Sequence, residues 1–207
     1  NSFSALDFIA ARATTSVKHY INRTKFIDSY IKQRKACRSI SSLPSSAVNL
    51  EAHQLSVVMQ VLSDPKQKYL LGDEVGLGKT IEAGFLIREH FLEKKNNAAI
   101  IVFTPDALVD QWKSELVTKF HLEDVMEDDF KNDEQKILVV PYTDAISIPK
   151  HFENPTMVVV DEGHNLANFA WSAESDVYNK ISNLCNESTT TLMLSGTPIS
   201  GNAKSFL

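Results

Sequence analysis

Short apolar runs, separated by amphipathic segments, dominate the later three quarters of this chain. Five of them are rich in Val, Ile and Leu: YLL (69–71), AAIIVF (98–103), KILVV (136–140), MVVVD (157–161) and TLMLS (191–195). Apolar residues follow one another in these runs and do not alternate with polar ones. That pattern is typical of strands buried on both faces of a parallel sheet.

Helical periodicity fills most of the gaps between the runs. Two stripes step at helical spacing: Ile81, Phe85, Arg88 and Leu92 within residues 80–94, and then Leu108, Trp112, Leu116 and Phe120. We interpret Trp112 as a core residue of its helix. Alternating strands and helices predict an α/β fold with a doubly wound parallel sheet. Ligands bind such sheets at the carboxyl ends of the strands, so the residues just after each run are the candidates for chemistry.

The beginning of the chain has a different pattern. Residues 4–20 and 24–38 read as two amphipathic helices, and the Ser/Pro-rich segment 39–47 reads as a connector. We therefore expect a helical extension over 1–45 and an α/β domain over 46–207.

Composition narrows the class of protein. The 207 residues are 43% hydrophobic, which is enough for a packed core. No apolar run approaches the roughly 20 residues that span a bilayer, and no secretory segment opens the chain. Cys37 and Cys185 have no C-x-x-C partner, which argues against a disulfide framework or a zinc site. These features predict a cytoplasmic protein with no membrane partner.

The net charge of −5 is unevenly distributed. Residues 1–40 contain eight Lys and Arg against two Asp, a balance of +6, so the remainder carries −11. A basic extension on an acidic body suggests a polyanion or protein partner for residues 1–40, although a solvated helix face explains the charge equally well. The acid-rich segment 122–135 reads as a solvated loop.

The first strand is followed by YLLGDEVGLGKT, which ends in the Gly-Lys-Thr of a phosphate-binding loop. In this pattern glycines let backbone N–H groups turn toward a phosphate chain at a helix N-terminus. Lys79 would reach the β- and γ-phosphates of ATP, and the Thr80 hydroxyl would hold Mg²⁺. The strict template, G-x-x-x-x-G-K-[ST], places its first glycine where this chain has Asp73.

A pair of carboxylates follows the most apolar run, in MVVVDEGH. Asp161 could hold Mg²⁺ opposite the phosphate loop, and Glu162 could orient and deprotonate an attacking water. An Asp-Glu pair after a strand is a weak signal by itself. The upstream Gly-Lys-Thr turn makes it a candidate catalytic pair with Lys79.

Four ordered segments together resemble a known family. DEVGLGKT, DEGH (161–164) and SGTP (195–198) resemble motifs I, II and III of superfamily-two helicase-like motors, and GDEVGLGKTIEAG is similar to the Swi/Snf-type branch, especially its bacterial RNA-polymerase-associated members. IIVFTPDALVDQWKSEL (100–116) is similar to motif Ia. Asp in place of the first glycine is common in that branch. The resemblance implies a RecA-like, P-loop NTPase lobe over about residues 46–207.

The resemblance also implies roles for single residues. For ATP it implies contacts from Gln54 (the adenine reader), Asp73, Gly76, Leu77, Gly78, Lys79 and Thr80. For coupling between the ATP site and the nucleic-acid face it implies His164, Ser195, Gly196 and Thr197. For nucleic-acid contact it implies Thr104, Gln111, Lys113 and Tyr142.

The implied function is that of an ATPase: the first lobe of a translocase that couples Mg-ATP hydrolysis to movement on double-stranded DNA. The second RecA-like lobe, which supplies arginines to the γ-phosphate, has no candidate segment in residues 1–207, so we expect this lobe alone to hydrolyse ATP poorly. Two alternatives stay open: a strand-separating helicase, and a nucleotide-dependent scaffold that binds nucleic acid or protein with little turnover.

Overall fold

The computed structural model describes residues 51–72, 78–123, 126, 136–170 and 175–196. All of them belong to a compact unit that extends from Ser41 to Leu207. The two helices predicted over 4–20 and 24–38 lie outside the described residues.

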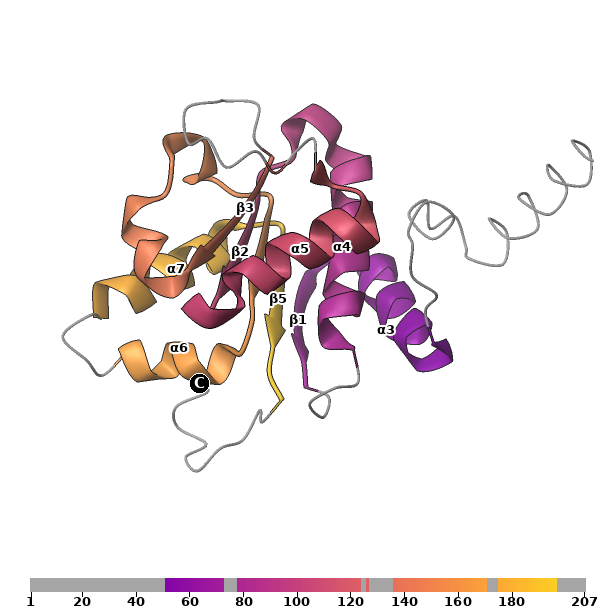
Figure 1. Cartoon of the computed structure of the whole chain (residues 1–207), viewed down its shortest axis with the longest axis horizontal. Coiled ribbons are helices and arrows are strands. Elements are labelled where there is room, and N and C mark those ends of the chain that lie inside the picture. The colour runs from indigo at the N-terminus through magenta and orange to yellow at the C-terminus, as the bar shows by residue number, and fades with distance from the viewer. Residues whose placement is uncertain (1–50, 73–77, 124–125, 127–135, 171–174, 197–207) are drawn as a thin grey trace, which may run out of the picture. The chain divides into compact units, whose positions relative to one another are not determined.

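Five parallel strands form one sheet in the order β1-β5-β4-β2-β3 (Figure 1). Their bounds are Gln67–Leu71 (β1), Ile100–Thr104 (β2), Ile137–Pro141 (β3), Met157–Val160 (β4) and Thr190–Leu194 (β5). Each begins and ends within two residues of a run identified in the sequence. The predicted α/β fold with a parallel sheet is confirmed.

Helices connect the strands and cover both faces of the sheet (Figure 1). They are α3 (Ala52–Ser63), α4 (Lys79–Lys94), α5 (Val109–Phe120), α6 (Gly163–Phe169) and α7 (Ser175–Glu187). Short 3₁₀ helices cover Lys95–Asn97 (η2), Asp106–Leu108 (η3), Tyr142–Ser147 (η5) and Lys150–Phe152 (η6). Among the described residues, no helix is both long and apolar enough to pass through a bilayer.

Strand alternation divides the core into two layers. One layer packs against α6 and α7 and includes Ile101 and Phe103 of β2, Leu138 and Val140 of β3, and Val158 and Val160 of β4. Successive side chains of a strand point to opposite faces. Ile100, Val102 and Thr104 therefore share the other face with Met157 and Val159, and Asp161 follows on that face.

The run YLL (69–71) was expected to be buried on both faces of the sheet, but the edge strand β1, which contains it, is partly exposed. Lys68 and Leu70 are exposed, and Leu70 retains 44% of its surface, whereas Leu71 is buried. The departure arises because β1 pairs only with β5 and is not flanked on its other side by a described strand. Lys68 instead extends its amine to the carbonyl oxygens of Cys185 and Asn186 at the end of α7.

The sheet order brings the chemistry-bearing segments together. β4 lies between β5 and β2, and the backbone N–H of Asp161 donates to the carbonyl of Phe103 over 2.8 Å. β1 pairs in register with β5, so the carboxyl end of β1 lies at the same edge of the sheet. Residues from three strand ends can therefore contribute to one site.

Candidate functional site

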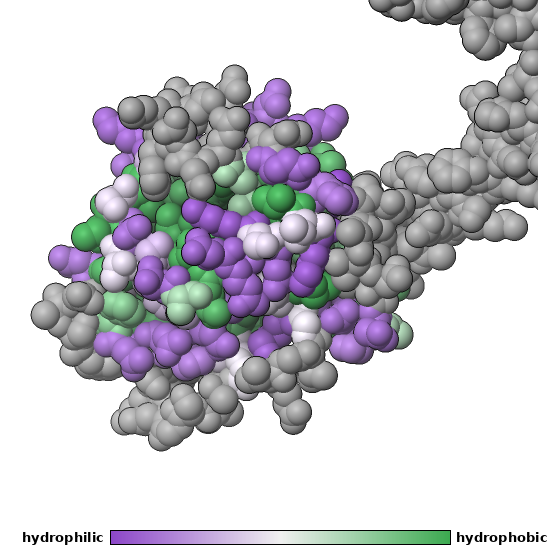
Figure 2. Space-filling view, in the orientation of Figure 1, coloured by the Kyte–Doolittle hydropathy of each residue, from purple (hydrophilic) through white to green (hydrophobic). Residues whose placement is uncertain are grey.

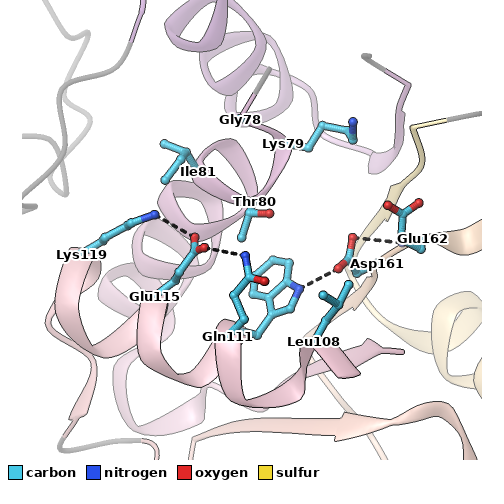
Figure 3. Close-up of a pocket in the computed structure, with 11 residues that line it drawn as sticks. Gly78, Lys79, Thr80, Ile81, Leu108, Gln111, Glu115, Lys119, Asp161 and Glu162 are labelled. Atoms are coloured by element: carbon cyan, nitrogen blue, oxygen red, sulfur yellow. Dashed lines mark hydrogen bonds and ion pairs between the residues drawn. The ribbon is translucent and has the colours of Figure 1, made fainter. Parts of the chain in front are cut away.

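A cavity of about 360 Å³ lies between the beginning of α4, the length of α5 and the carboxyl end of β4 (Figure 3). It is lined by Gly78, Lys79, Thr80, Ile81, Leu108, Gln111, Trp112, Glu115, Lys119, Asp161 and Glu162. Lys79 and Thr80 stand on one side of it in Figure 3, and Asp161 and Glu162 stand on the other. The Gly-Lys-Thr turn and the acidic pair, which are about eighty residues apart in sequence, thus border one space.

Gly78 is the residue immediately before α4 and has a left-handed φ of 89°. Only glycine adopts this conformation at low cost, because it has no Cβ. A Cβ at this position would also collide with Nε2 of Gln54. The turn leaves Lys79 and Thr80 in the first turn of α4, where backbone N–H groups and the helix dipole suit an anion. Asp73, Gly76 and Leu77 lie outside the described residues.

Gln54 is buried in the first turn of α3, with its amide nitrogen against Gly78. Its Oε1 accepts a hydrogen bond from the backbone N–H of Glu51 over 3.0 Å, as part of a capping box. The expected adenine reader therefore lies against the turn that precedes Lys79. Its contact with a nucleotide base stays a prediction.

The carboxylate of Asp161 is buried and accepts three hydrogen bonds. Oδ2 accepts from the indole Nε1 of Trp112 over 2.7 Å and from Oγ1 of Thr104 over 3.2 Å, and Oδ1 accepts from the backbone N–H of Glu162 over 3.0 Å. Burial raises the pKa of Asp161, while the hydrogen bond from Trp112 acts in the opposite direction. These donors stabilise the ionised form at a site where burial alone would disfavour it.

Glu162 has a left-handed backbone, with φ of 49°. This conformation is uncommon for a residue other than glycine, and such residues concentrate at functional sites. Its Oε2 lies 3.3 Å from Nδ1 of His164. The same Nδ1 lies 3.3 Å from Oγ of Ser195, at the end of β5. Gly196 follows Ser195 in a bend, and Thr197 lies outside the described residues.

Two residues that were expected to face nucleic acid are buried. Thr104 is 0% exposed and donates to Asp161, and Tyr142 is 5% exposed. The Tyr142 hydroxyl donates to the backbone carbonyls of Asp161 and, over 3.2 Å, of Glu162. Burial raises the pKa of Tyr142 far above its usual range, so the hydroxyl remains a donor. Both side chains face inward and support the acidic pair, which differs from the expected exposure.

The other two expected nucleic-acid contacts lie on different sides of α5. Gln111 borders the cavity that Lys79 lines and donates to Glu115 over 3.0 Å. Lys113 borders a separate cavity of about 290 Å³ beside β3, which Asp106 and Asp144 also line. The outer surface of α5 is mainly hydrophilic (Figure 2), and its exposed polar residues are Asp110, Gln111, Ser114 and Thr118.

Sequence reasoning missed the role of Trp112. It is buried, as expected of a core residue, but its indole nitrogen contacts Asp161. A buried indole N–H usually has an acceptor, so the predicted burial of Trp112 was the one signal in the sequence that it has a polar partner. Glu115 and Lys119, which pair over 3.0 Å along the cavity, were also not anticipated.

Comparison with known proteins identifies the family. Residues 50–207 match the SNF2-related domain. The chain is 35% identical over 155 residues to the uncharacterized ATP-dependent helicase YqhH of Bacillus subtilis, and 31% identical over 192 residues to the RNA polymerase-associated protein RapA of Proteus mirabilis. The matches cover 71% and 84% of this chain but only 26% and 19% of those proteins.

Solved structures share the fold. The SWI2/SNF2 ATPase core of Sulfolobus solfataricus in complex with dsDNA superposes with a TM-score of 0.59 at 20% identity, covering 78% of this chain and 35% of that one. The UvsW helicase of bacteriophage T4 superposes with a TM-score of 0.60 at 19% identity, covering 77% of this chain and 56% of that one. With its helicase-like, RecA-like ATPase fold and the match over residues 50–207, the chain belongs to the SNF2-related domain family.

Proposed function

We propose that this chain is the first ATP-binding lobe of a Swi/Snf-type translocase, which couples Mg-ATP hydrolysis to movement on double-stranded DNA. The observation that carries the proposal is the shared cavity of Lys79, Thr80, Asp161 and Glu162. A cation, a hydroxyl and two carboxylates around one space match the needs of phosphoryl transfer, which depends mainly on positioning and on charge neutralisation.

The residues present fit a magnesium ion. Thr80 and Asp161 offer hard oxygen donors on the two sides of the cavity, and Mg²⁺ prefers such donors, together with phosphate oxygens and water. Magnesium bound there would neutralise charge on the β- and γ-phosphates. Among the described residues, Oδ1 of Asp161 accepts a hydrogen bond from the backbone N–H of Glu162. A carboxylate oxygen has two lone pairs, so Oδ1 retains capacity for a further partner.

The remaining site residues divide the work. The Lys79 ammonium would contact the β- and γ-phosphates, and the N–H groups at the start of α4 would hold their oxygens. Glu162 would orient the attacking water and take its proton. Gln54 would read adenine from beside Gly78. Asp73, Gly76 and Leu77 would complete the loop.

His164 and Ser195 would couple the nucleotide site to the bound DNA. Gly196 and Thr197 belong to the same segment as Ser195. The contact between His164 and Ser195 joins the residue after β5 to the helix that follows the acidic pair. His164 contacts both Glu162 and Ser195, so a shift of the Glu162 side chain would also shift Ser195, and a shift of Ser195 would shift Glu162.

We propose that the protein moves along duplex DNA and that α5 contacts this DNA. Lys113 and Gln111 are the side-chain contacts that we propose. The side chains of Thr104 and Tyr142 are buried in this structure, and contact of their segments with nucleic acid stays a prediction. A structural neighbour with the same fold was solved with dsDNA, and relatives of this chain are named for association with RNA polymerase. We accordingly propose duplex DNA as the partner, and RNA polymerase as a candidate protein partner through residues 1–40.

This chain covers about a fifth to a quarter of the curated relatives, so a second lobe is part of the proposal. That lobe would contribute an arginine to the γ-phosphate, worth on the order of 10³–10⁵ in rate. We expect residues 1–207 alone to bind nucleotide weakly and to turn it over slowly.

The test is an ATPase assay on the protein at its natural length, with duplex DNA, single strands and RNA as separate additions. Duplex should stimulate hydrolysis most, without strand displacement. Lys79→Ala should abolish nucleotide binding, measured with a fluorescent ATP analogue. Undiminished binding by that variant would remove Lys79 from the site, and stimulation accompanied by strand displacement would make the protein a strand-separating helicase.

A further inference from the structure

The contact between Trp112 and Asp161 bears on the proposed cation site. The indole of Trp112, on α5, donates to Oδ2 of Asp161 over 2.7 Å, which is the shortest of the three hydrogen bonds to this carboxylate. Thr104, at the end of β2, donates to the same oxygen. Oδ2 thus accepts hydrogen bonds from two different elements, while Oδ1 accepts one from the backbone N–H of Glu162.

The fold brings these three side chains together for a simple reason. Thr104 is the last residue of β2, and Asp161 directly follows the adjacent parallel strand β4. By strand alternation, both side chains lie on the same face of the sheet. α5 packs across that face and places Trp112 over the strand ends. The exposed fractions are 0% for Thr104, 2% for Trp112 and 8% for Asp161, so water has little access to Oδ2.

This arrangement restricts the orientation of the carboxylate. Rotation of the Asp161 side chain would break two hydrogen bonds at once and leave a buried indole N–H and a buried hydroxyl without an acceptor. A polar group that is buried without a partner is unfavourable, so this orientation of the carboxylate is favoured. The dashed lines in Figure 3 show the result: one oxygen of Asp161 is bound to the indole, and the other is turned toward Glu162.

We propose that Trp112 is a positioning residue for the cation site: its indole holds Oδ2 of Asp161, with Thr104, so that Oδ1 is presented to a divalent cation. The inference rests on the proposed function, because it concerns the same carboxylate. Hydrogen bonds to a ligating carboxylate typically change metal affinity by roughly 10–100-fold. In this proposal Trp112 acts through Asp161 and would itself contact neither the cation nor the phosphates.

A purely structural role for Trp112 makes a different prediction. If the indole only fills the space between α5 and the sheet, its removal would loosen the lobe and weaken nucleotide binding with or without metal. If it positions Asp161, its removal would weaken the metal-dependent part of binding alone. The two readings separate when nucleotide affinity is measured both with Mg²⁺ and with a chelator.

The experiment compares Trp112→Phe and Thr104→Val with wild type in the protein at its natural length. Trp112→Phe keeps an aromatic ring and removes the N–H donor, and Thr104→Val keeps the shape and removes the hydroxyl; Thr104→Ser retains the hydroxyl and should behave like wild type. Phe120→Leu is the matched packing control, since Phe120 is buried on the same helix and packs on Phe85 with ring centroids 5.2 Å apart, outside the cavity. Manganese, a divalent ion with its own electron paramagnetic resonance spectrum, serves as the metal probe with a non-hydrolysable ATP analogue.

We expect Trp112→Phe to weaken Mn²⁺ binding in the nucleotide complex by roughly 10–100-fold and to leave metal-free nucleotide affinity unchanged. Thr104→Val should act in the same direction, and Phe120→Leu should lower Tm without changing Mn²⁺ affinity. Equal Mn²⁺ affinity in wild type, Trp112→Phe and Thr104→Val would overturn this inference and leave the proposed function intact. If wild type itself showed no metal-dependent nucleotide binding, both would fail. Should Trp112→Phe not fold, Thr104→Val against Thr104→Ser decides the question.

Discussion

Nδ1 of His164 lies 3.3 Å from Oγ of Ser195, although the two residues are separated by the whole of α7 and β5. The same nitrogen lies 3.3 Å from Oε2 of Glu162. Ser195 is itself held in place, because its backbone N–H donates to the carbonyl of Leu71 at the end of β1 over 3.1 Å. One imidazole therefore contacts both the acidic pair and the residue after β5, and the backbone of that residue is bound to the end of β1.

Replacing His164 should uncouple nucleotide binding from DNA binding. We expect His164→Ala to keep nucleotide affinity but to reduce the increase in duplex affinity that a non-hydrolysable ATP analogue produces; such couplings are typically worth about 1–3 kcal/mol. Fluorescence anisotropy of labelled duplex, with and without the analogue, measures this. Ser195→Ala should act similarly, and the double variant should add little, because both substitutions remove one shared contact. Unchanged coupling in both single variants would contradict the assigned role.

Glu162→Gln should separate binding from hydrolysis. The substitution preserves shape and removes the base, so Mg-nucleotide affinity should change little while the single-turnover hydrolysis rate falls by roughly 10²–10⁴-fold. The exposed residue Glu153 offers a control, Glu153→Gln, which should hydrolyse ATP at the wild-type rate. Normal hydrolysis by Glu162→Gln would show that another group takes the proton.

Two glycine substitutions, one just before α4 and one within it, should have different consequences. Gly78→Ala forces a Cβ into a left-handed backbone and against Gln54, so nucleotide affinity should fall at least about tenfold. Gly84→Ala meets the ring of Phe120 away from the cavity, and this overpacking should cost roughly 1–3 kcal/mol of stability. Calorimetric Tm and nucleotide titration together distinguish them. If Gly84→Ala lost nucleotide binding at unchanged Tm, this division would be wrong.

His90 should make the fold sensitive to acid. It is buried on α4 with Nε2 2.9 Å from Oγ1 of Thr156, and burial, followed by Lys94, lowers its pKa to about 4, while Glu93 acts in the opposite direction. Because the unfolded chain binds this proton near pH 6.5 and the folded chain does not, stability is fully present above about pH 6.5 and falls as the pH drops toward 4. The loss attributable to His90 is at most about 3 kcal/mol.

Urea unfolding at pH 7.5 and pH 5 tests this expectation. His90→Gln, which can still contact Thr156, should reduce the difference in unfolding free energy between the two pH values. A variant with the same pH dependence as wild type would show that the carboxylates, not His90, set the acid sensitivity.

Lys113 should contribute a phosphate contact to duplex binding. Lys113→Ala should weaken duplex affinity similarly for all sequences and reduce the salt slope of log K by about 1. The matched control is Lys66→Ala, because Lys66 is exposed before β1, at the opposite end of the strands from the cavity. An unchanged salt slope in Lys113→Ala would remove α5 from the proposed DNA interface.

Much of this architecture was readable from the linear pattern. Continuous apolar runs predicted the parallel strands, because burial on both faces leaves no polar positions to alternate. The Gly-Lys-Thr turn and the Asp-Glu pair were identifiable because their chemistry needs few residue types at fixed offsets. Their placement at strand ends predicted that Lys79 and Asp161 would border one cavity, and the structure brings them there.

Other features depended on contacts between distant segments. Whether Thr104 and Tyr142 face nucleic acid or Asp161 is decided by which strands are neighbours and by which face α5 covers, and local pattern contains neither. Trp112 shows the same limit. Its helical spacing determined that it is buried, but only the packing of α5 against the end of β4 decided that its indole binds a carboxylate, because hydrogen bonds between buried groups depend on distances that the chain sets only when it folds.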